Sequence, residues 1–374
     1  MAEAKVNPIR QKFETTAREL GEALVERDVE IEGLLACLVA DEHVLLIGPP
    51  GTAKSLLLDS IVQWTNGKRF SVLLNGQSTL GDLLGPVALS SLKQDKHLRN
   101  TQGQLPEAHF AFLDEIFKGN SSARNCVLRI ANERQYPKGD GSWATCPLRL
   151  LVGASNEWPR IEDDAEAIFD RFLFRKEVKH VTSSSGLTEL VFGGDHRPRF
   201  STTLDLEELD EARKQAVAIK WSEEAKEALM AIIHDLHKDG IYPSERRLVK
   251  AKKMAQASAW LDGAAEVDTE HLAILSHVLW VIPQEQPAKA AAVVLKHANP
   301  SQARVAARLE EVEQIVKGCK EGDLIAAQSA ASKLAEILKK LKAEKSAKAK
   351  AACEKVQAEI KRIKIQAVSA ATGN

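Results

Sequence analysis

The sequence has few cysteines, and their arrangement excludes two common kinds of small domain. The five are odd in number, widely spaced and outside any Cys-x-x-Cys pair: Cys37, Cys126, Cys146, Cys319 and Cys353. This pattern fits neither a disulfide scaffold nor a zinc module, and it is typical of a reducing compartment. The ten histidines form no His-Glu-x-x-His motif, so a zinc site is not expected. We therefore expect a cytoplasmic protein.

Long apolar runs are also missing. No stretch approaches the roughly 18 apolar residues of a membrane span, and the start of the chain, MAEAKVNPIRQKFE, lacks the apolar segment of a signal peptide. Lys and Arg number 51 against 52 Asp and Glu, a formal charge of -1, which disfavours nucleic acid as a partner for the chain as a whole. Residues 331–374 differ, with eleven Lys or Arg and four Glu, a net charge of +7.

The remaining composition is that of folded domains. With 44% hydrophobic and 28% charged residues, wholesale disorder is not expected. Short apolar runs alternate with helical patterns, which predicts an α/β domain with a mostly parallel sheet. Turn residues predict a β-hairpin in 132–147 and another insertion in 76–105. The expected strands are 43–47, 109–113 and 148–154, and the expected helices of this part are 55–64 and 121–131 with helical segments in 11–40.

Strand patterns end near residue 192, and helical ones follow. Four helices are expected between 205 and 280, at about 205–219, 222–238, 244–261 and 268–280. We therefore predict an αβα core in 1–192, a linker in 193–204, an all-helical domain in 205–282, a linker in 283–300 and a C-terminal helical hairpin with a basic tail in 301–374.

A phosphate-binding loop is the strongest functional motif. The sequence GPPGTAKS comes directly after a predicted strand and opens a helix, where backbone N–H groups and the helix dipole favour a polyphosphate. Lys54 is expected to reach the β- and γ-phosphates and Ser55 to bind Mg²⁺. Ala53 stands where a glycine is usual, which is acceptable if its φ is negative. The residues expected to bind ATP or ADP are Gly48, Pro49, Pro50, Gly51, Thr52, Ala53, Lys54, Ser55 and Leu56.

Polar residues follow the next two predicted strands. HFAFLDE ends in Asp114, a candidate Mg²⁺ ligand, and Glu115, a candidate for polarising the attacking water. LLVGASNEWP places Asn156 level with them, where an amide can hydrogen-bond the water or the γ-phosphate. Taken alone, two acids at a strand end also suit a solvated edge, and Asn156 also suits a turn. About 60 residues after a phosphate loop, the functional interpretation is favoured.

Two arginine pairs complete the candidate site. FDRFLFR carries Arg171 and Arg175; arginine can stabilise a phosphoryl transition state, also from a neighbouring subunit, although surface ion pairs are the alternative. In YPSERRLVKA, Ser244 is a candidate N-cap, which places Arg246 and Arg247 in the first turn of a helix. Basic groups there oppose the helix dipole, so an anionic partner would explain them.

In this order, GPPGTAKS, FAFLDE, GASN, FDRF and PSERR resemble the motifs of an AAA+ ATPase of the MoxR family. The neighbouring text (LGPVALSSLK, RNTQGQLPEAHFAFLDEIFK, NERQY, LLVGASNEWP) is most similar to the RavA branch, over about residues 8–282. The resemblance implies a P-loop NTPase core with a helical lid. It also implies Walker A at 48–55, Walker B at Asp114 and Glu115, sensor 1 at Asn156, an arginine finger at Arg171 and sensor 2 at Arg246. Arg175 and Arg247 remain possible substitutes.

The resemblance further implies ATP hydrolysis with Mg²⁺ in a homo-oligomer, a hexameric ring or a spiral, that acts as a chaperone on a protein client. A von Willebrand factor A domain protein is a candidate client. RavA-like chains continue into a larger accessory region with a β-rich module, which the helical patterns after the lid do not match. Two alternatives stay open: a nucleotide-gated scaffold with slow turnover, and a DNA-acting relative that uses the basic tail.

Overall fold

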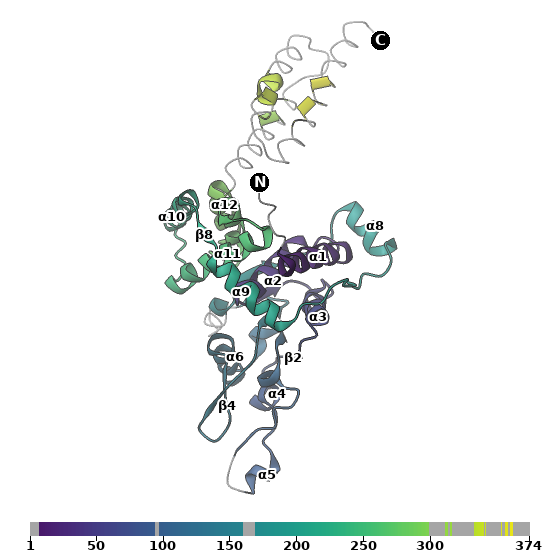
Figure 1. The fold of residues 1–374 in the computed structure, drawn as a ribbon, viewed down its shortest axis with the longest axis vertical. Helices are drawn as coiled ribbons and strands as arrows, with labels where there is room; N and C mark the ends of the chain where they lie inside the picture. The colour runs from purple at the N-terminus through teal and green to yellow at the C-terminus, as the bar shows by residue number, and fades with distance from the viewer. Residues whose placement is uncertain are drawn as a thin grey trace. The chain divides into compact units, whose positions relative to one another are not determined.

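The computed structural model describes residues 7–93, 97–159 and 169–298, with short helical stretches beyond them, of which 333–339 is the longest. The chain divides into two compact units, 1–291 and 292–374. The predicted hairpin in 301–374 lies almost entirely outside the described residues. The fold of the first unit, which carries every candidate site residue, is traced in Figure 1.

A five-stranded parallel sheet in the order β2-β3-β6-β1-β7 forms the core. Every residue of β1 and of β6 is buried, as expected for central strands covered on both faces. The predicted α/β class is therefore confirmed. The strands are β1 (Val44–Ile47), β2 (Arg69–Leu73), β3 (Phe110–Asp114), β6 (Leu150–Ser155) and β7 (Phe174–Glu177).

Two of these strands, β2 and β7, were not predicted. Both lie at the edges of the sheet, and both carry charged residues, so neither reads as a continuous apolar run. In β7 three of the four residues are charged (Arg175, Lys176 and Glu177), so its sequence does not have the pattern of a buried strand. The strand forms because β7 pairs along its whole length with β1, and this tertiary contact stabilises a segment that has no strand pattern of its own.

Helix α2 is apolar around most of its circumference, and ten of its thirteen residues are buried, so it is a core helix. At α1, Phe13 packs edge-on against Trp64 at 4.9 Å and Trp260 at 5.2 Å. These contacts join α1 to helices that lie far apart in the sequence. The helices around the sheet are α1 (Pro8–Ala23), α2 (Asp28–Ala40), α3 (Lys54–Thr65) and α6 (Ser121–Glu133).

Both predicted insertions are present. The antiparallel hairpin is formed by β4 (Gln135–Pro137) and β5 (Trp143–Thr145). The earlier insertion leads from β2 to β3, and its Val87 bridges to Arg99. Its short helices are α4 (Leu80–Leu84), α5 (Leu89–Leu92) and η1 (Leu105–Glu107), while η2 (Ile116–Lys118) follows β3 and α8 (Ser184–Phe192) follows β7.

The helical lid follows, and it differs from the prediction in three places. The predicted helix at 268–280 is a 3₁₀ helix, η3. A two-residue parallel bridge, β8 with β9, occurs in a domain that was expected to be all helical. The predicted linker 283–300 contains helix α12. The elements are α9 (Leu206–Ala218), β8 (Lys220–Trp221), α10 (Glu223–Lys238), α11 (Glu245–Asp262), β9 (Glu266–Val267), η3 (Glu270–His277) and α12 (Pro287–Ala298).

Acid should weaken the packing of the lid on the core through His277, whose ring lies 5.1 Å from that of Phe174. Burial lowers the pKa of His277 from 6.5 to about 4, with a smaller contribution from Lys176. The native state therefore binds fewer protons than the unfolded state between these values. This contribution to stability is complete above about pH 6.5 and is lost as the pH falls towards 4; it amounts to about 3 kcal/mol.

We predict that His277→Gln makes the free energy of unfolding less dependent on pH between 7 and 4.5. Urea unfolding of both proteins at several pH values measures this directly. Other buried groups, such as His43, are present in both proteins and cancel in the comparison. Equal pH slopes for the two proteins would show that His277 titrates normally.

Candidate nucleotide site

The loop from Gly48 to Ala53 is rooted in the sheet at its first residue. The Gly48 N–H donates to the Ser155 carbonyl at 3.0 Å, and the Val178 N–H donates to the Ile47 carbonyl at 2.7 Å. A Cβ at position 48 would lie 2.1 Å from the Val178 carbonyl oxygen. Only glycine therefore lets the loop leave β1 between the ends of β6 and β7.

The middle of the loop is curled by left-handed residues. Gly51 has φ 77° and Ala53 has φ 65°, and such turns direct successive N–H groups into a concave anion-binding surface. The Thr52 hydroxyl donates to the Pro49 carbonyl at 2.9 Å. Because α3 begins directly afterwards, its positive N-terminal end faces the same concavity.

Ala53 corrects the expectation from the sequence. From the sequence, an alanine was acceptable here on the condition of a negative φ, and the structure gives φ 65° and ψ 19° at the N-cap of α3. The left-handed conformation costs an L-residue roughly 1–2 kcal/mol, a cost that glycine avoids. The loop therefore keeps the geometry of the glycine-containing motif, but with strain at this position.

Lys54 spans the concavity. Its Nζ donates to the carbonyls of Gly48 at 2.6 Å and Pro49 at 2.8 Å, and lies 3.4 Å from the Asn156 Oδ1. Burial lowers the pKa of Lys54, while the negative charges of Asp114 and Glu115 oppose this shift. A partly desolvated cation held among carbonyl oxygens is well placed to exchange them for phosphate oxygens.

The three candidate residues at the ends of β3 and β6, Asp114, Glu115 and Asn156, lie around Lys54. The sheet register sets Ile47 opposite Ser155 and Leu113 opposite Gly153, so the residues after these strands share one edge. The Asn156 amide donates to Glu115 Oε1 at 2.6 Å. The other carboxylate oxygen, Oε2, is buried without a hydrogen bond in the described part of the chain, and its ion pair with the half-exposed Lys118 is 3.3 Å long.

Ser55 and Asp114 fit a Mg²⁺ ion. Ser55 lies in the first turn of α3 and is exposed, while Asp114 is half-buried at the end of β3 and accepts a hydrogen bond from the Glu115 N–H at 3.0 Å. Within the residues that the structure describes, no cluster of three or more His, Cys, Asp or Glu forms a complete metal cage. Mg²⁺ needs none, because it commonly keeps waters and phosphate oxygens beside one or two protein ligands.

Arg171 and Arg246 lie at the opposite end of the sheet, where the parallel strands begin. Arg171 precedes β7, where the Leu173 N–H donates to the His43 carbonyl at 3.1 Å, before the start of β1. Arg246 is exposed in the first turn of α11. The length of β1, about 13 Å for four residues, therefore separates the backbone at Arg171 from the phosphate loop of its own chain.

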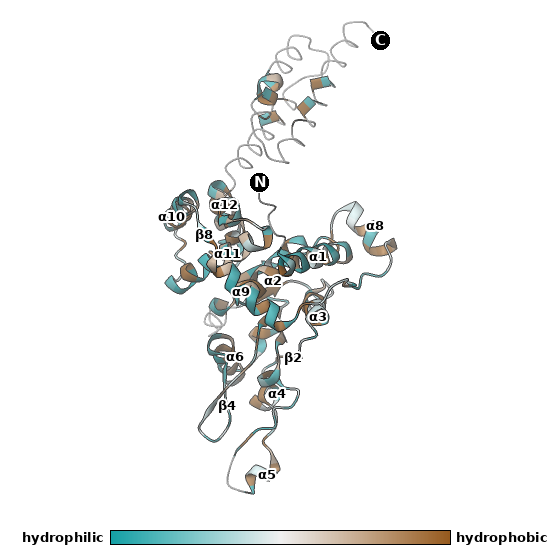
Figure 2. Ribbon diagram, viewed as in Figure 1, coloured by the Kyte–Doolittle hydropathy of each residue, from teal (hydrophilic) through white to brown (hydrophobic). Residues whose placement is uncertain are grey.

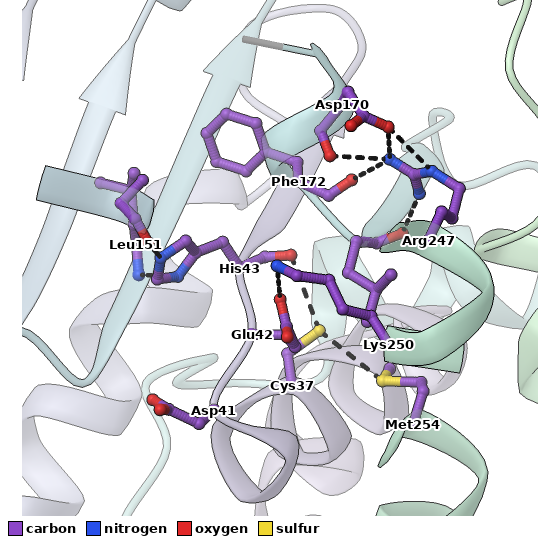
Figure 3. Close-up of polar contacts among 12 residues, drawn as sticks. Cys37, Asp41, Glu42, His43, Leu151, Asp170, Phe172, Arg247, Lys250 and Met254 are labelled. Atoms are coloured by element: carbon purple, nitrogen blue, oxygen red, sulfur yellow. Dashed lines mark hydrogen bonds and ion pairs between the residues drawn. The ribbon is translucent and has the colours of Figure 1, made fainter. Parts of the chain in front are cut away.

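Arg247 belongs to the contact between lid and core (Figure 3). Its guanidinium contacts the Asp170 carboxylate at 3.3 Å and donates to the carbonyls of Leu173 at 3.0 Å and Val278 at 2.9 Å. It also donates to the carbonyls of Asp170 and Phe172. These bonds occupy the guanidinium of Arg247 and anchor the first turn of α11 beside Arg171.

Arg175 is also occupied inside the chain. Its guanidinium lies 4.3 Å from the ring centroids of both Phe169 and Trp280, and it donates to the carbonyls of Val278 and Trp280. Arg175 is almost fully buried. Of the two arginines in each pair that the sequence left open, Arg175 and Arg247 therefore have internal partners, whereas the side chain of Arg171 is partly exposed and that of Arg246 exposed.

Two supporting interactions were not predicted. Arg27 donates to the Thr52 carbonyl at 3.3 Å and to the Lys179 carbonyl at 2.8 Å, which braces the loop against the end of β7. Lys250 forms a 2.5 Å ion pair with the buried Glu42, so α11 is held to the end of α2 (Figure 3). Neither has a local sequence signal, because each partner lies far away in the sequence.

The fold and the converging residues define a P-loop nucleotide-binding core with a helical lid. The family model for the MoxR domain of MoxR-vWA-beta-propeller ternary systems matches residues 11–214, and an AAA lid domain matches 224–292. The chain belongs to this MoxR family of AAA+ ATPases.

Individual relatives agree with this assignment. Two uncharacterized proteins of Methanocaldococcus jannaschii are each 38% identical, over 73% and 74% of this chain and 72% of their own lengths. The chaperone MoxR1 of Mycobacterium tuberculosis is 25% identical over 43% of this chain and 42% of its own. A crystal structure of a putative ATPase from Cytophaga hutchinsonii has the same fold, with a TM-score of 0.63 and 18% identity over 78% of this chain and 95% of that one. No helix in the described residues is long and apolar enough to cross a membrane.

We predict that Ala53→Gly stabilises the protein by about 0.5–1 kcal/mol, because glycine relieves the left-handed strain but loses more entropy on folding. Denaturant unfolding without nucleotide measures the change. The matched control is Ala123→Gly, at a buried position inside helix α6, which should destabilise. A lower stability of Ala53→Gly would contradict the positive φ.

Proposed function

We propose that this chain hydrolyses ATP at a site that two copies build together. One observation carries the proposal. Lys54, Glu115 and Asn156 meet at the carboxyl edge of the sheet, whereas Arg171 and Arg246 lie at its amino edge. The arginines would therefore serve the nucleotide of a neighbouring copy.

Each group has a chemical role in this proposal. The N–H groups of the loop and Lys54 hold the phosphates, and Mg²⁺, held by Ser55 and Asp114, would neutralise phosphate charge. Glu115 polarises the attacking water, and its hydrogen bond from Asn156 fixes the carboxylate that does so. Glu115 Oε2 accepts no hydrogen bond within the described residues and faces only Lys118, at 3.3 Å, so it would be the oxygen that accepts from that water.

Arg171 and Arg246 would stabilise charge on the transferred phosphoryl group of the neighbour. An arginine finger supplied in trans is worth roughly 10³–10⁵ in rate, so a monomer would be nearly inactive. A contact in which one edge meets the opposite edge of the next copy is head-to-tail, and repeating it gives a closed ring or a spiral. A hexameric ring is the arrangement we propose for this family member.

The substrate of the assembly would be a protein. The matching family model describes MoxR domains that occur with vWA and beta-propeller proteins, and the relative MoxR1 is named a chaperone. We propose a chaperone-like remodelling of a vWA-domain partner. The RavA branch stays a prediction that rests on the quoted segments alone. A nucleotide-gated scaffold with slow turnover is the first alternative. A DNA-acting protein is the second and weaker alternative, because the charge of the chain is close to neutral.

Lys54→Ala should abolish nucleotide binding, and Glu115→Gln should preserve binding while reducing phosphate release at least about 100-fold, the usual scale of general-base loss. Binding of a fluorescent ATP analogue and steady-state phosphate release measure the two effects. Persistent assembly with ATP but negligible turnover of the unmodified protein would favour the scaffold instead.

Subunit mixing tests the trans arginines. Arg171→Ala has an intact phosphate loop but no finger, and Glu115→Gln has a finger but no working water-activating group. Each alone should be inactive, and their mixture should regain activity, because the second supplies the finger to the first. Arg246→Ala should behave in the same way. If mixing restores nothing, or if Arg171→Ala turns over normally, the arginines do not act across the interface.

A further inference from the structure

Helix α8 carries an apolar stripe that is uncovered within the described structure. Leu187, Leu190 and Val191 follow helical spacing and share one face, and Phe192 closes the helix. Their exposed fractions are 45%, 45%, 67% and 82%. Figure 2 shows apolar colour reaching the end of this helix. Four large apolar side chains on one short surface helix are the mark of an interaction site.

The lid has an apolar groove of about 1070 Å³ that none of the described residues fills. Its walls come from the end of α9, strand β8 and helices α10 and α11, and they include Val217, Trp221, Met230, Leu248 and Val249. Val217, Met230 and Val249 are each more than half exposed. A groove of this kind suits the apolar face of a helix.

The charges of the two surfaces are complementary. Lys220 and Lys252 line the groove and have no acidic partner among the ion pairs of the described residues, whereas Lys226 is held by Glu223 at 2.6 Å. The segment 181–196, which contains α8, has Glu189 and Asp195 but no Lys or Arg. Asp195 is already paired with Arg199 at 3.4 Å, so Glu189 is the acidic side chain that α8 offers to the groove. The C-terminal end of α8 adds the negative end of a helix dipole.

The positions of the two surfaces match the divided site. Helix α8 is tied to the phosphate-loop side, because the Ser183 N–H donates to Glu26 at 3.1 Å and the next residue, Arg27, binds the loop. The groove includes Leu248 and Val249, two and three residues after Arg246 on the same helix. In Figure 1 α8 and α10 lie on opposite sides of the first unit, so α8 does not cover the groove of its own chain.

We infer that α8 of one copy docks in the lid groove of the next copy. This inference rests on the proposed function, and it names the contact that brings the arginines of one chain to the phosphate loop of another. Helix α8 comes after β7, which ends beside the phosphate loop, and on α11 the groove begins two residues after Arg246. Docking them places the two halves of the catalytic site on the same side of one interface.

Two surface variants test the contact. Val191→Ser with Phe192→Ser removes the apolar end of α8, and Met230→Ser with Val249→Ser removes the groove wall. Each should raise the concentration needed for nucleotide-dependent assembly at least about tenfold, the effect of losing an interface hot spot. Analytical ultracentrifugation with a slowly hydrolysed ATP analogue measures it. The control Leu89→Ser, an equally exposed leucine on α5, should assemble normally.

Mixing the two variants separates this contact from others. The α8 variant keeps its groove and the groove variant keeps its helix, so the mixture should form pairs with one intact contact but no longer assemblies. Because that contact includes one complete site, phosphate release should return in the mixture. Normal assembly of either variant, or no pairs in the mixture, would overturn the inference. If assembly follows the inference but the unmodified protein releases no phosphate, only the proposed ATPase function fails.

Discussion

The close approach of Gly48 to Val178 is the constraint on which the site depends. It roots the phosphate loop where β1, β6 and β7 end together, and the parallel register then decides which other residues stand at that edge. Asn156 follows β6 next to β1, and Glu115 follows β3 on the far side of β6. The site is thus a consequence of strand order and register, and a shift of one residue in any strand would separate its groups.

The same sheet explains why the arginines are elsewhere. Arg171 precedes β7 and therefore lies at the amino end of a strand whose carboxyl end adjoins the loop. Arg247 binds Asp170 and the backbone that leads into β7, so the first turn of α11 is fixed at that amino end. A single buried arginine thus holds Arg246 near Arg171 and away from the phosphate loop of its own chain. The proposed division of the site between copies would follow from this packing.

What the sequence could predict was local. The phosphate loop, the acids after β3 and Asn156 each follow an apolar run directly, so pattern alone located them and the parallel sheet brought them together. The roles of neighbouring arginines could not be separated, because Arg246 and Arg247 differ only in which face of α11 they occupy. Strands β2 and β7 were missed because edge strands carry charged residues. The positive φ of Ala53 could not be predicted either, because the pattern of side chains in the sequence does not determine φ at a single residue.

The strain at Ala53 has a counterpart at Glu115, which is left-handed as well, with φ 50°. Each non-glycine residue in this region costs roughly 1–2 kcal/mol. Ala53 and Glu115 are two of the seven such residues in the described structure, and they stand at the phosphate loop and at the carboxylate proposed to activate water. Such conformations persist only where the surroundings determine them. For Glu115 the surroundings are the Asn156 amide and the buried end of β3, which turn its carboxylate towards Lys54 rather than along the strand. At Glu115 the strained backbone therefore gives the side chain the direction that the proposed chemistry needs.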